Sequence, residues 1–375
     1  ISDGVTLNHY VGEIHAHTSL SDGVGTPEDA YTYARDVGKV DFFGLTDHSH
    51  HAGFKTAATN GSYFSAAESF NESGRYVTLP GYEWTSNHEC GWFGHINIYN
   101  TDYSDTGWIE FRRNVLLSDI YTMLKKYPTA FAQFNHPGYS WGNFMKYDLW
   151  DPEIDKIVRT ADIKGKGYDL QYHLALDKGW HISPLNSEDN HEANWTTATK
   201  ATGVIMAPSL TRENIVEAIR LNRTYSTDDP KLRIDYRING QVMGARLQNA
   251  TELNFNIKIT HPNEAIGTVS ILVDGGVVIK SQNFNTNIAE WNFTLPAEYK
   301  YYVVKVLQPN NNYATSAPIW NENTKPIKIN KLDYAFTSND INVKLNLQNV
   351  GSENLKNVKV EFYDVNDITG TSLKT

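Results

Sequence analysis

The chain has 375 residues and a mass of 42.4 kDa, which is more than one ordinary domain needs and enough for two. Hydrophobic residues make up 40% of it and charged residues 20%, so large cores can form and global disorder is excluded. The formal net charge is −10 and no Lys/Arg run occurs, which argues against a nucleic-acid binder. No apolar stretch approaches the ~20 residues of a membrane span, and the single cysteine, Cys90, excludes an intrachain disulfide.

Strand-like and helix-like segments alternate up to about residue 225. Thr26 is a typical N-cap, and Pro27 follows it at the first helical position. Strands are predicted at 11–17, 40–47, 76–84, 95–99, 131–135 and 181–188, and helices at 27–37, 62–72, 108–126, 168–178 and 212–222. The alternation predicts an α/β layer or barrel with parallel strands over residues 1–228.

Period-two patterns replace this alternation after Pro230. They occur at 232–238, 253–259, 268–279, 290–295 and 301–307, between turns rich in Gly, Asn and Pro, and they predict a β-sandwich over residues 229–324. Further strands are predicted at 327–334, 341–349 and 358–363. Because three strands are too few for a closed sandwich, we expect residues 325–375 to be a partial immunoglobulin-like module that continues beyond this chain.

Twelve of the thirteen histidines lie in the first 191 residues, so the chemistry is expected in the front half. His15 and His17 end the first strand on one face, and other His, Asp and Glu residues follow the later strands. The full set of candidate ligands is His15, His17, Asp22, His48, Glu83, His95, His136, Asp189 and His191. A single strand-end histidine is more often structural, but nine such positions in an alternating pattern predict a metal centre at one mouth of a barrel. Nitrogen and oxygen donors without thiolates suit two or three divalent ions of Zn, Mn or Fe.

The string "GEIHAHTSLSDGVGTPEDAYTYARDVGKVDFFGLTDHSH" resembles the opening of the polymerase and histidinol phosphatase (PHP) domain family. The later "LPGYEW", "GHINIY", "FNHPG" and "SEDNH" resemble its remaining motifs, and "NIVEAIRLNRTYST" before a β domain resembles its CehA/McbA-like branch. The resemblance implies a distorted (β/α)7 barrel that hydrolyses mainly phosphoesters, although the branch includes a carbamate-ester hydrolase.

Carried over by motif, the resemblance implies three metal positions. His15 and His17 would hold the first metal with Glu83 and Asp189, and Glu83 would bridge to a second metal held by His95 and His136. A third metal would take Asp22, His48 and His191; Asp22 stands where many members have a histidine.

A hydroxide bridging two or three such metals needs no protein nucleophile. His50 is a candidate general acid for the leaving group, although a solvated loop histidine would look the same in sequence. Asp47 is a candidate hydrogen-bond acceptor that orients a ligand imidazole, with direct metal ligation as the less favoured alternative. Trp92 and Trp141 are candidates to line the substrate pocket.

The leading hypothesis is a metal-dependent phosphoesterase acting on a small or exposed phosphoester. The first alternative is hydrolysis of a carboxylic or carbamate ester at the same centre, and the second is a non-catalytic surface-binding protein. No nucleic-acid partner and no membrane span are expected, whereas the β modules are candidates for contacting a surface glycan or protein. Trailing β modules of this kind are typical of extracellular or cell-surface enzymes, so we expect that location.

Overall fold

The computed structural model describes residues 6–86, 93–101, 116–138, 140–163, 166–322, 327–336, 341–349, 362–363 and 372–374. The chain forms two compact units, Ile1–Glu322 and Asn323–Thr375. The first unit combines strands and helices in its front half with two β-sheets in its back half. None of the helices described is long and apolar enough to span a bilayer.

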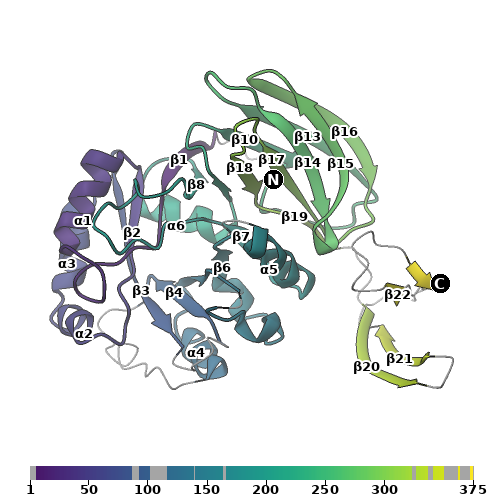
Figure 1. Ribbon diagram of the computed structural model, residues 1–375, viewed down its shortest axis with the longest axis horizontal. Coiled ribbons are helices and arrows are strands. Elements are labelled where there is room, and N and C mark those ends of the chain that lie inside the picture. The colour runs from purple at the N-terminus through teal and green to yellow at the C-terminus, as the bar shows by residue number, and fades with distance from the viewer. Residues whose placement is uncertain are drawn as a thin grey trace. The chain divides into compact units, whose positions relative to one another are not determined.

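One run of paired strands, in the order β9-β8-β1-β2-β3-β4-β5-β6-β7, forms the front half of the first unit (Figure 1). The bounds are β1 Asn8–Glu13, β2 Phe42–Leu45, β3 Val77–Thr85, β4 His95–Tyr99, β5 Phe131–Asn135, β6 Val158–Ala161, β7 Ser183–Pro184, β8 Thr202–Ala207 and β9 Thr224–Thr227. The hydroxyl of Thr224 on β9 donates a 2.8 Å hydrogen bond to the carbonyl of Pro184 on β7. The two ends of the run therefore lie against each other.

The run is mixed rather than parallel, which corrects the prediction from strand–helix alternation. Strands β1, β2 and β3 pair in parallel, as do β5, β6 and β7. Strand β4 is antiparallel to both β3 and β5, and β8 is antiparallel to both β1 and β9. Only nine positions separate Thr85 from His95, fewer than the dozen or so residues of a parallel crossover, so β4 returns antiparallel to β3.

Helices cover the strand run and largely follow the predicted positions. They are α1 Pro27–Tyr33, α2 Ala52–Thr59, α3 Ser62–Phe70, α4 Leu117–Leu124, α5 Lys166–Asp177 and α6 Arg212–Arg220. Thr26 and Asp29 form a capping box at the start of α1, and Figure 1 shows α1, α2 and α3 gathered on one side of β2. The sequence reading missed α2, and residues 108–115 of the helix predicted at 108–126 lie outside the described part of the chain.

The back half of the first unit is a pair of sheets over one apolar core. Strands β10 Arg233–Ile238, β11 Gln241–Val242, β13 Glu252–Thr260 and β16 Ile288–Pro296 form one sheet, in the order β11-β10-β13-β16. Strands β12 Arg246–Leu247, β14 Gly267–Val273, β15 Val277–Phe284, β17 Tyr301–Leu307, β18 Tyr313–Ser316 and β19 Ile319–Asn321 belong to the larger sheet. Burial alternates along β10 and β13, which is the expected pattern for strands with one face on a core. The segment predicted at 268–279 is two strands, because Asp274–Gly276 forms a turn in which Gly275 has φ 69°.

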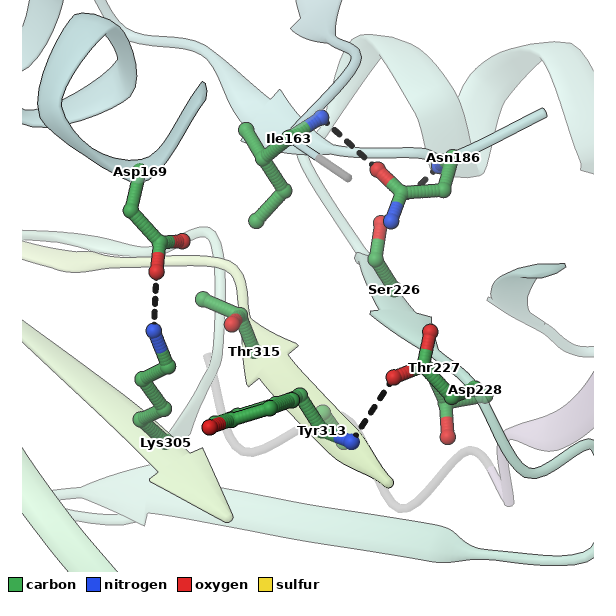
Figure 2. Close-up of a pocket in the computed structure, with 10 residues that line it drawn as sticks. Ile163, Asp169, Asn186, Ser226, Thr227, Asp228, Lys305, Tyr313 and Thr315 are labelled. Atoms are coloured by element: carbon green, nitrogen blue, oxygen red, sulfur yellow. Dashed lines mark hydrogen bonds and ion pairs between the residues drawn. The ribbon is translucent and has the colours of Figure 1, made fainter. Parts of the chain in front are cut away.

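Strand β18 joins the two halves of the first unit, because it pairs antiparallel with β9. Val204, Met206 and Tyr225 from the front half belong to the same buried cluster as the core of the back half. A cavity of about 200 Å³ lies beside this junction. Figure 2 shows residues that line it. An ion pair between Lys305 and Asp169 lines it and ties β17 to α5 (Figure 2). The two halves therefore share a sheet and a core.

The second unit contains the expected strands in part. Strand β20, Ile327–Phe336, pairs antiparallel with β21, Ile341–Asn349. Strand β22, Phe362–Tyr363, pairs with β23, Ser372–Lys374. Residues 358–361 of the strand predicted at 358–363 lie outside the described residues.

Candidate metal centre

All nine candidate ligands meet at one edge of the strand run. His15 and His17 follow β1, and His48 follows β2. Because these strands are parallel to β3, their carboxyl ends meet at the edge where Glu83 lies near the end of β3. The remaining candidates are His95 at the start of the antiparallel β4, His136 after β5, Asp189 and His191 after β7, and Asp22 in the loop after His17. The structure thus brings together nine residues that are spread over 177 positions of the sequence, from His15 to His191.

Four side chains form a first group with the spacing of a tetrahedral site. Nε2 of His15 lies 3.1 Å from Oδ1 of Asp189 and 3.5 Å from Oε1 of Glu83. Nε2 of His17 lies 3.1 Å from the same Asp189 oxygen, 3.3 Å from Oε2 of Glu83 and 3.3 Å from Nε2 of His15. Four donors at ~2.1 Å from a zinc-like ion would stand about 3.4 Å apart, so the observed spacing fits one cation at their centre.

A second group shares Glu83. Oε1 of Glu83 lies 3.1 Å from Nδ1 of His95 and 3.5 Å from Nε2 of His136. Within this group, as within the first, all the donor atoms lie within 4.8 Å of one another. Glu83 therefore belongs to both groups.

The third group contains Asp22, His48 and His191, and also His17. Oδ1 of Asp22 lies 3.6 Å from Nε2 of His48 and 3.3 Å from Nε2 of His191. The His17 ring stacks on that of His191 with their centroids 4.1 Å apart. His17 joins two of the three groups, which the motif comparison did not indicate.

The carboxylates and imidazoles of the first group shift one another's pKa values. Burial lowers the pKa of His15, but the carboxylates of Asp189 and Glu83 outweigh it and raise the pKa to about 9. His17, buried against the same two carboxylates, has its pKa raised to about 10. Burial raises the pKa of Glu83, yet the neighbouring imidazoles, led by His48, hold it well below its usual value. Metal binding at this group would therefore displace protons from the two imidazoles.

Two buried oxygens indicate what the centre is built to hold. Oε2 of Glu83 and Oδ1 of Asp189 accept no hydrogen bond within the described part of the chain, although imidazole nitrogens lie within 3.3 Å of each. Buried carboxylate oxygens of this kind are costly unless they are paired or coordinate a metal. Two carboxylate oxygens that converge on imidazole nitrogens without accepting a hydrogen bond fit a divalent cation between them.

The backbone is strained at two of these positions. His136 has φ 27° and Asp189 has φ 57°, in the left-handed region that residues other than glycine rarely adopt. Such a conformation costs about 1–2 kcal/mol per residue and persists where the surrounding structure imposes it. Both residues belong to the candidate ligand groups, so the strain lies where the site requires particular side-chain directions.

Asp47 supports the centre through a neighbour. Its carboxylate accepts hydrogen bonds from the amide and hydroxyl of Thr18, both at 2.8 Å, and from the hydroxyl of Ser21 at 2.6 Å. The Ser21 hydroxyl in turn lies 3.3 Å from Nδ1 of His17. Asp47 therefore holds the loop after His17, and among the described residues it reaches an imidazole through Ser21 rather than by the expected direct contact.

Further supporting residues were not identified from the sequence. The hydroxyl of Thr85 lies 2.7 Å from Nδ1 of His48, and the Asn135 amide donates to Oε1 of Glu83 at 2.9 Å. The only available signal was position, since Asn135 directly precedes His136 and Thr85 ends the strand that carries Glu83.

A cavity of about 300 Å³ opens onto the three groups, and it is lined by His50, His51 and Trp141 besides candidate ligands. The His50 ring lies 5.4 Å from that of His48, and its role as a proton donor stays a prediction. Trp141 is 53% exposed, with its ring 5.4 Å from that of His95, so it lines the pocket as expected. Trp92, the other aromatic candidate, and Cys90 lie outside the described residues.

No family model matches the chain. An uncharacterized protein of Chlamydia pneumoniae is 20% identical over 362 residues, covering 82% of this chain and 56% of that protein, so the chain spans about half the length of this curated relative. A crystal structure from Bacteroides vulgatus, described as a two-domain protein containing a predicted PHP-like metal-dependent phosphoesterase, covers 84% of this chain and 95% of its own, with 16% identity and a TM-score of 0.47. Similarity at this level says nothing about the activity of this chain, and the function proposed next rests on the site.

Proposed function

We propose that this protein is a metal-dependent hydrolase and that its preferred substrate is a phosphoester. The observation that carries the proposal is the set of three overlapping donor groups beside one cavity, with Glu83 shared between two of them. Divalent metal ions at such a centre supply Lewis acidity toward the scissile ester and lower the pKa of water toward neutrality. The motifs quoted from the sequence support membership of the PHP family and its CehA/McbA-like branch.

The protein's own side chains would bind the metals and donate a proton to the leaving group. The carboxylates of Glu83 and Asp189 concentrate negative charge where the cations bind, and the histidines complete each group. Within the described lining of the cavity, the one aliphatic hydroxyl belongs to Thr85 and is hydrogen-bonded to His48. This supports water as the nucleophile, with His50 at the cavity wall as the proton donor to the leaving group.

A carboxylic or carbamate ester is the second candidate substrate, and one observation favours it. The described lining of the cavity contains no Lys or Arg to grip a phosphate. Arg212, at the start of α6, pairs with Glu68 and donates to the carbonyl of Thr78 at 2.8 Å. The metals and the side chains that line the cavity would therefore have to distinguish the two types of ester.

Quantifying Zn, Mn and Fe in the purified protein, followed by assays on phosphomonoester, phosphodiester and carboxyl-ester substrates, tests the proposal. We expect at least two metal ions per chain and phosphoester turnover that a chelator abolishes and added metal restores. Turnover of carboxyl esters alone would select the second candidate. A protein that binds no metal and hydrolyses none of the substrates would instead support a binding role, in which the β modules contact a surface glycan or protein. Location outside the cell is part of the same proposal.

A further inference from the structure

A second cavity of about 660 Å³ lies on the opposite side of the strand run from the metal centre. It is bounded by the start of β6, the end of α6 and the segment around β11 and β12. Since β5 and β6 are parallel, the amino end of β6 is remote from the carboxyl end of β5, which His136 follows. The two cavities therefore have no lining residue in common among those described.

Positive charge dominates this second cavity. Its charged lining residues are Lys156, Arg159, Arg220, Arg223 and Arg246, against one carboxylate, Glu217. Arg246 also pairs with Asp155 at 3.5 Å and with Glu322 at 3.7 Å, so the excess of positive charge rests on the other four cations. The excess is notable in a chain of net charge −10, where cations have many carboxylates available as partners. Packing cations together around a concave surface raises the local potential and attracts anions.

Two of the cations hydrogen-bond to neutral oxygens. Arg220 donates to the carbonyls of Thr129 and Pro128 at 3.1 and 3.0 Å. Arg159 donates to the carbonyl of Asp155 at 2.8 Å and to the side-chain oxygen of Asn222. These bonds fix the direction of each guanidinium and leave its charge available to a ligand.

Arg159 is the buried member of the group, with 6% of its surface exposed. Its Nε makes no hydrogen bond within the described part of the chain. Burial lowers the pKa of Arg159 to about 10. The carboxylate of Asp155 opposes this shift, whereas the positive charges of Arg246 and Arg220 add to it. A buried guanidinium with an unmet donor is unfavourable, and an oxyanion that accepted from it would relieve that cost.

The chain around the cavity is held in place before any ligand arrives. Asn222, with φ 54°, donates from its amide to the carbonyls of Arg159 and His181. Gly244, with φ 89°, packs against the end of α6 so closely that a Cβ at this position would lie 2.3 Å from the carbonyl oxygen of Leu221. Arginines on such a rigid frame lose little freedom on binding and match the oxygens of phosphate with paired donors.

We propose that this cavity binds a small organic ligand carrying more than one phosphate group. The number of cations calls for several negative charges, and Leu221 and Val242 add apolar surface for the organic part. The volume lies within the roughly 300–1,000 Å³ typical of small-molecule sites, and the overall negative charge of the chain disfavours a long polyanion.

Isothermal titration calorimetry of the full-length, metal-loaded protein with tripolyphosphate tests this site. We expect saturable binding that weakens as NaCl is added. Arg223→Ala and Lys156→Ala should each weaken it by about tenfold, the effect of losing a charge-assisted contact of about 1.4 kcal/mol. Arg75→Ala, which removes an exposed cation paired with Glu72 elsewhere, is the matched control and should change nothing.

The same titration on Glu83→Ala separates this site from the metal centre. Tripolyphosphate binding that survives Glu83→Ala and is weakened by Arg223→Ala supports the second site, whether or not the protein proves to be a hydrolase. Binding that is lost in Glu83→Ala and unchanged in Arg223→Ala overturns the proposal, because the anion then sits at the metals. Absence of binding at millimolar tripolyphosphate, or binding only of a nucleic-acid oligomer, overturns it as well.

Discussion

Glu83 is the residue on which the centre most depends, because it lies within 3.5 Å of His15, His95 and His136. Glu83→Ala removes an oxygen donor from two groups together with the charge that holds two cations close. We expect at least one metal ion per chain to be lost and hydrolysis to collapse. Metal content by mass spectrometry and turnover of the best substrate are the measurements.

His50→Ala is the matched comparison at the same cavity. His50 lines the cavity without belonging to the donor groups found in the described residues. We expect a loss of ~10²–10⁴-fold in turnover, as for other general acids, with full metal content. A Glu83→Ala protein with full metal content and near-normal turnover would contradict the hydrolase proposed here.

Asp47 should contribute both to the stability of the fold and to the position of the loop that carries Asp22. Asp47→Ala leaves the Thr18 amide and the Thr18 and Ser21 hydroxyls without their acceptor, which we expect to cost about 2–4 kcal/mol of unfolding free energy. The loop that carries Asp22 would lose its anchor, so metal content should fall as well. Asp47→Asn, which keeps one acceptor oxygen, should show a smaller loss in both urea unfolding and metal content. Unchanged metal content in Asp47→Ala would show that this carboxylate does not position the loop.

Among the helices, α5 carries a pH-sensitive contact with β17. Nδ1 of His173 lies 3.0 Å from the Tyr301 hydroxyl, which donates to Asp177 at 3.1 Å, so the imidazole donates to the tyrosine oxygen. Burial, with Lys305 adding to it, lowers the pKa of His173 to about 4 from its usual 6.5. Between these values the unfolded chain binds more protons than the folded one, so the contribution of His173 to stability falls as the pH drops from 6.5 toward 4.

His173→Gln should remove this sensitivity. At pH 7 the variant should be less stable than the natural protein, and the difference in unfolding free energy should shrink by roughly 2 kcal/mol or less as the pH falls to 4.5. Urea unfolding at several pH values measures it. Because both proteins keep the metal centre, loss of metal in acid affects them alike. A difference that did not change with pH would show that His173 is not held neutral.

At the scale of the whole molecule, the two halves of the first unit should fold only together. A chain of residues 1–228 would expose the edge of β9 and the buried side chains of Val204, Met206 and Tyr225. We expect it to be unfolded or aggregated, as judged by circular dichroism and thermal melting. A chain of residues 1–322 keeps the shared sheet and should retain its melting temperature and metal content. A cooperative, metal-binding 1–228 chain would contradict this view.

The sequence by itself determined the features that depend on local chemistry. The Thr26 cap, the strands at His95–Tyr99 and Phe131–Asn135, and the alternation along β13 follow from neighbouring residues, and the structure has them where predicted. The nine candidate ligands were recognisable because polar residues at strand ends interrupt apolar segments, and parallel strands present their carboxyl ends at a common edge. Their roles as ligands stay a prediction.

Only the tertiary structure decided those features that depend on which residues lie close together in space. The antiparallel pairing of β8 with β1, the two groups that share His17 and the route from Asp47 through Ser21 could not be read from spacing alone, because pairing direction and side-chain angles are set by packing. The basic cavity is the clearest case. Its cations come from residues 156 to 246, each of them unremarkable in sequence, and only the packing of α6 and β6 against the back half brings like charges together.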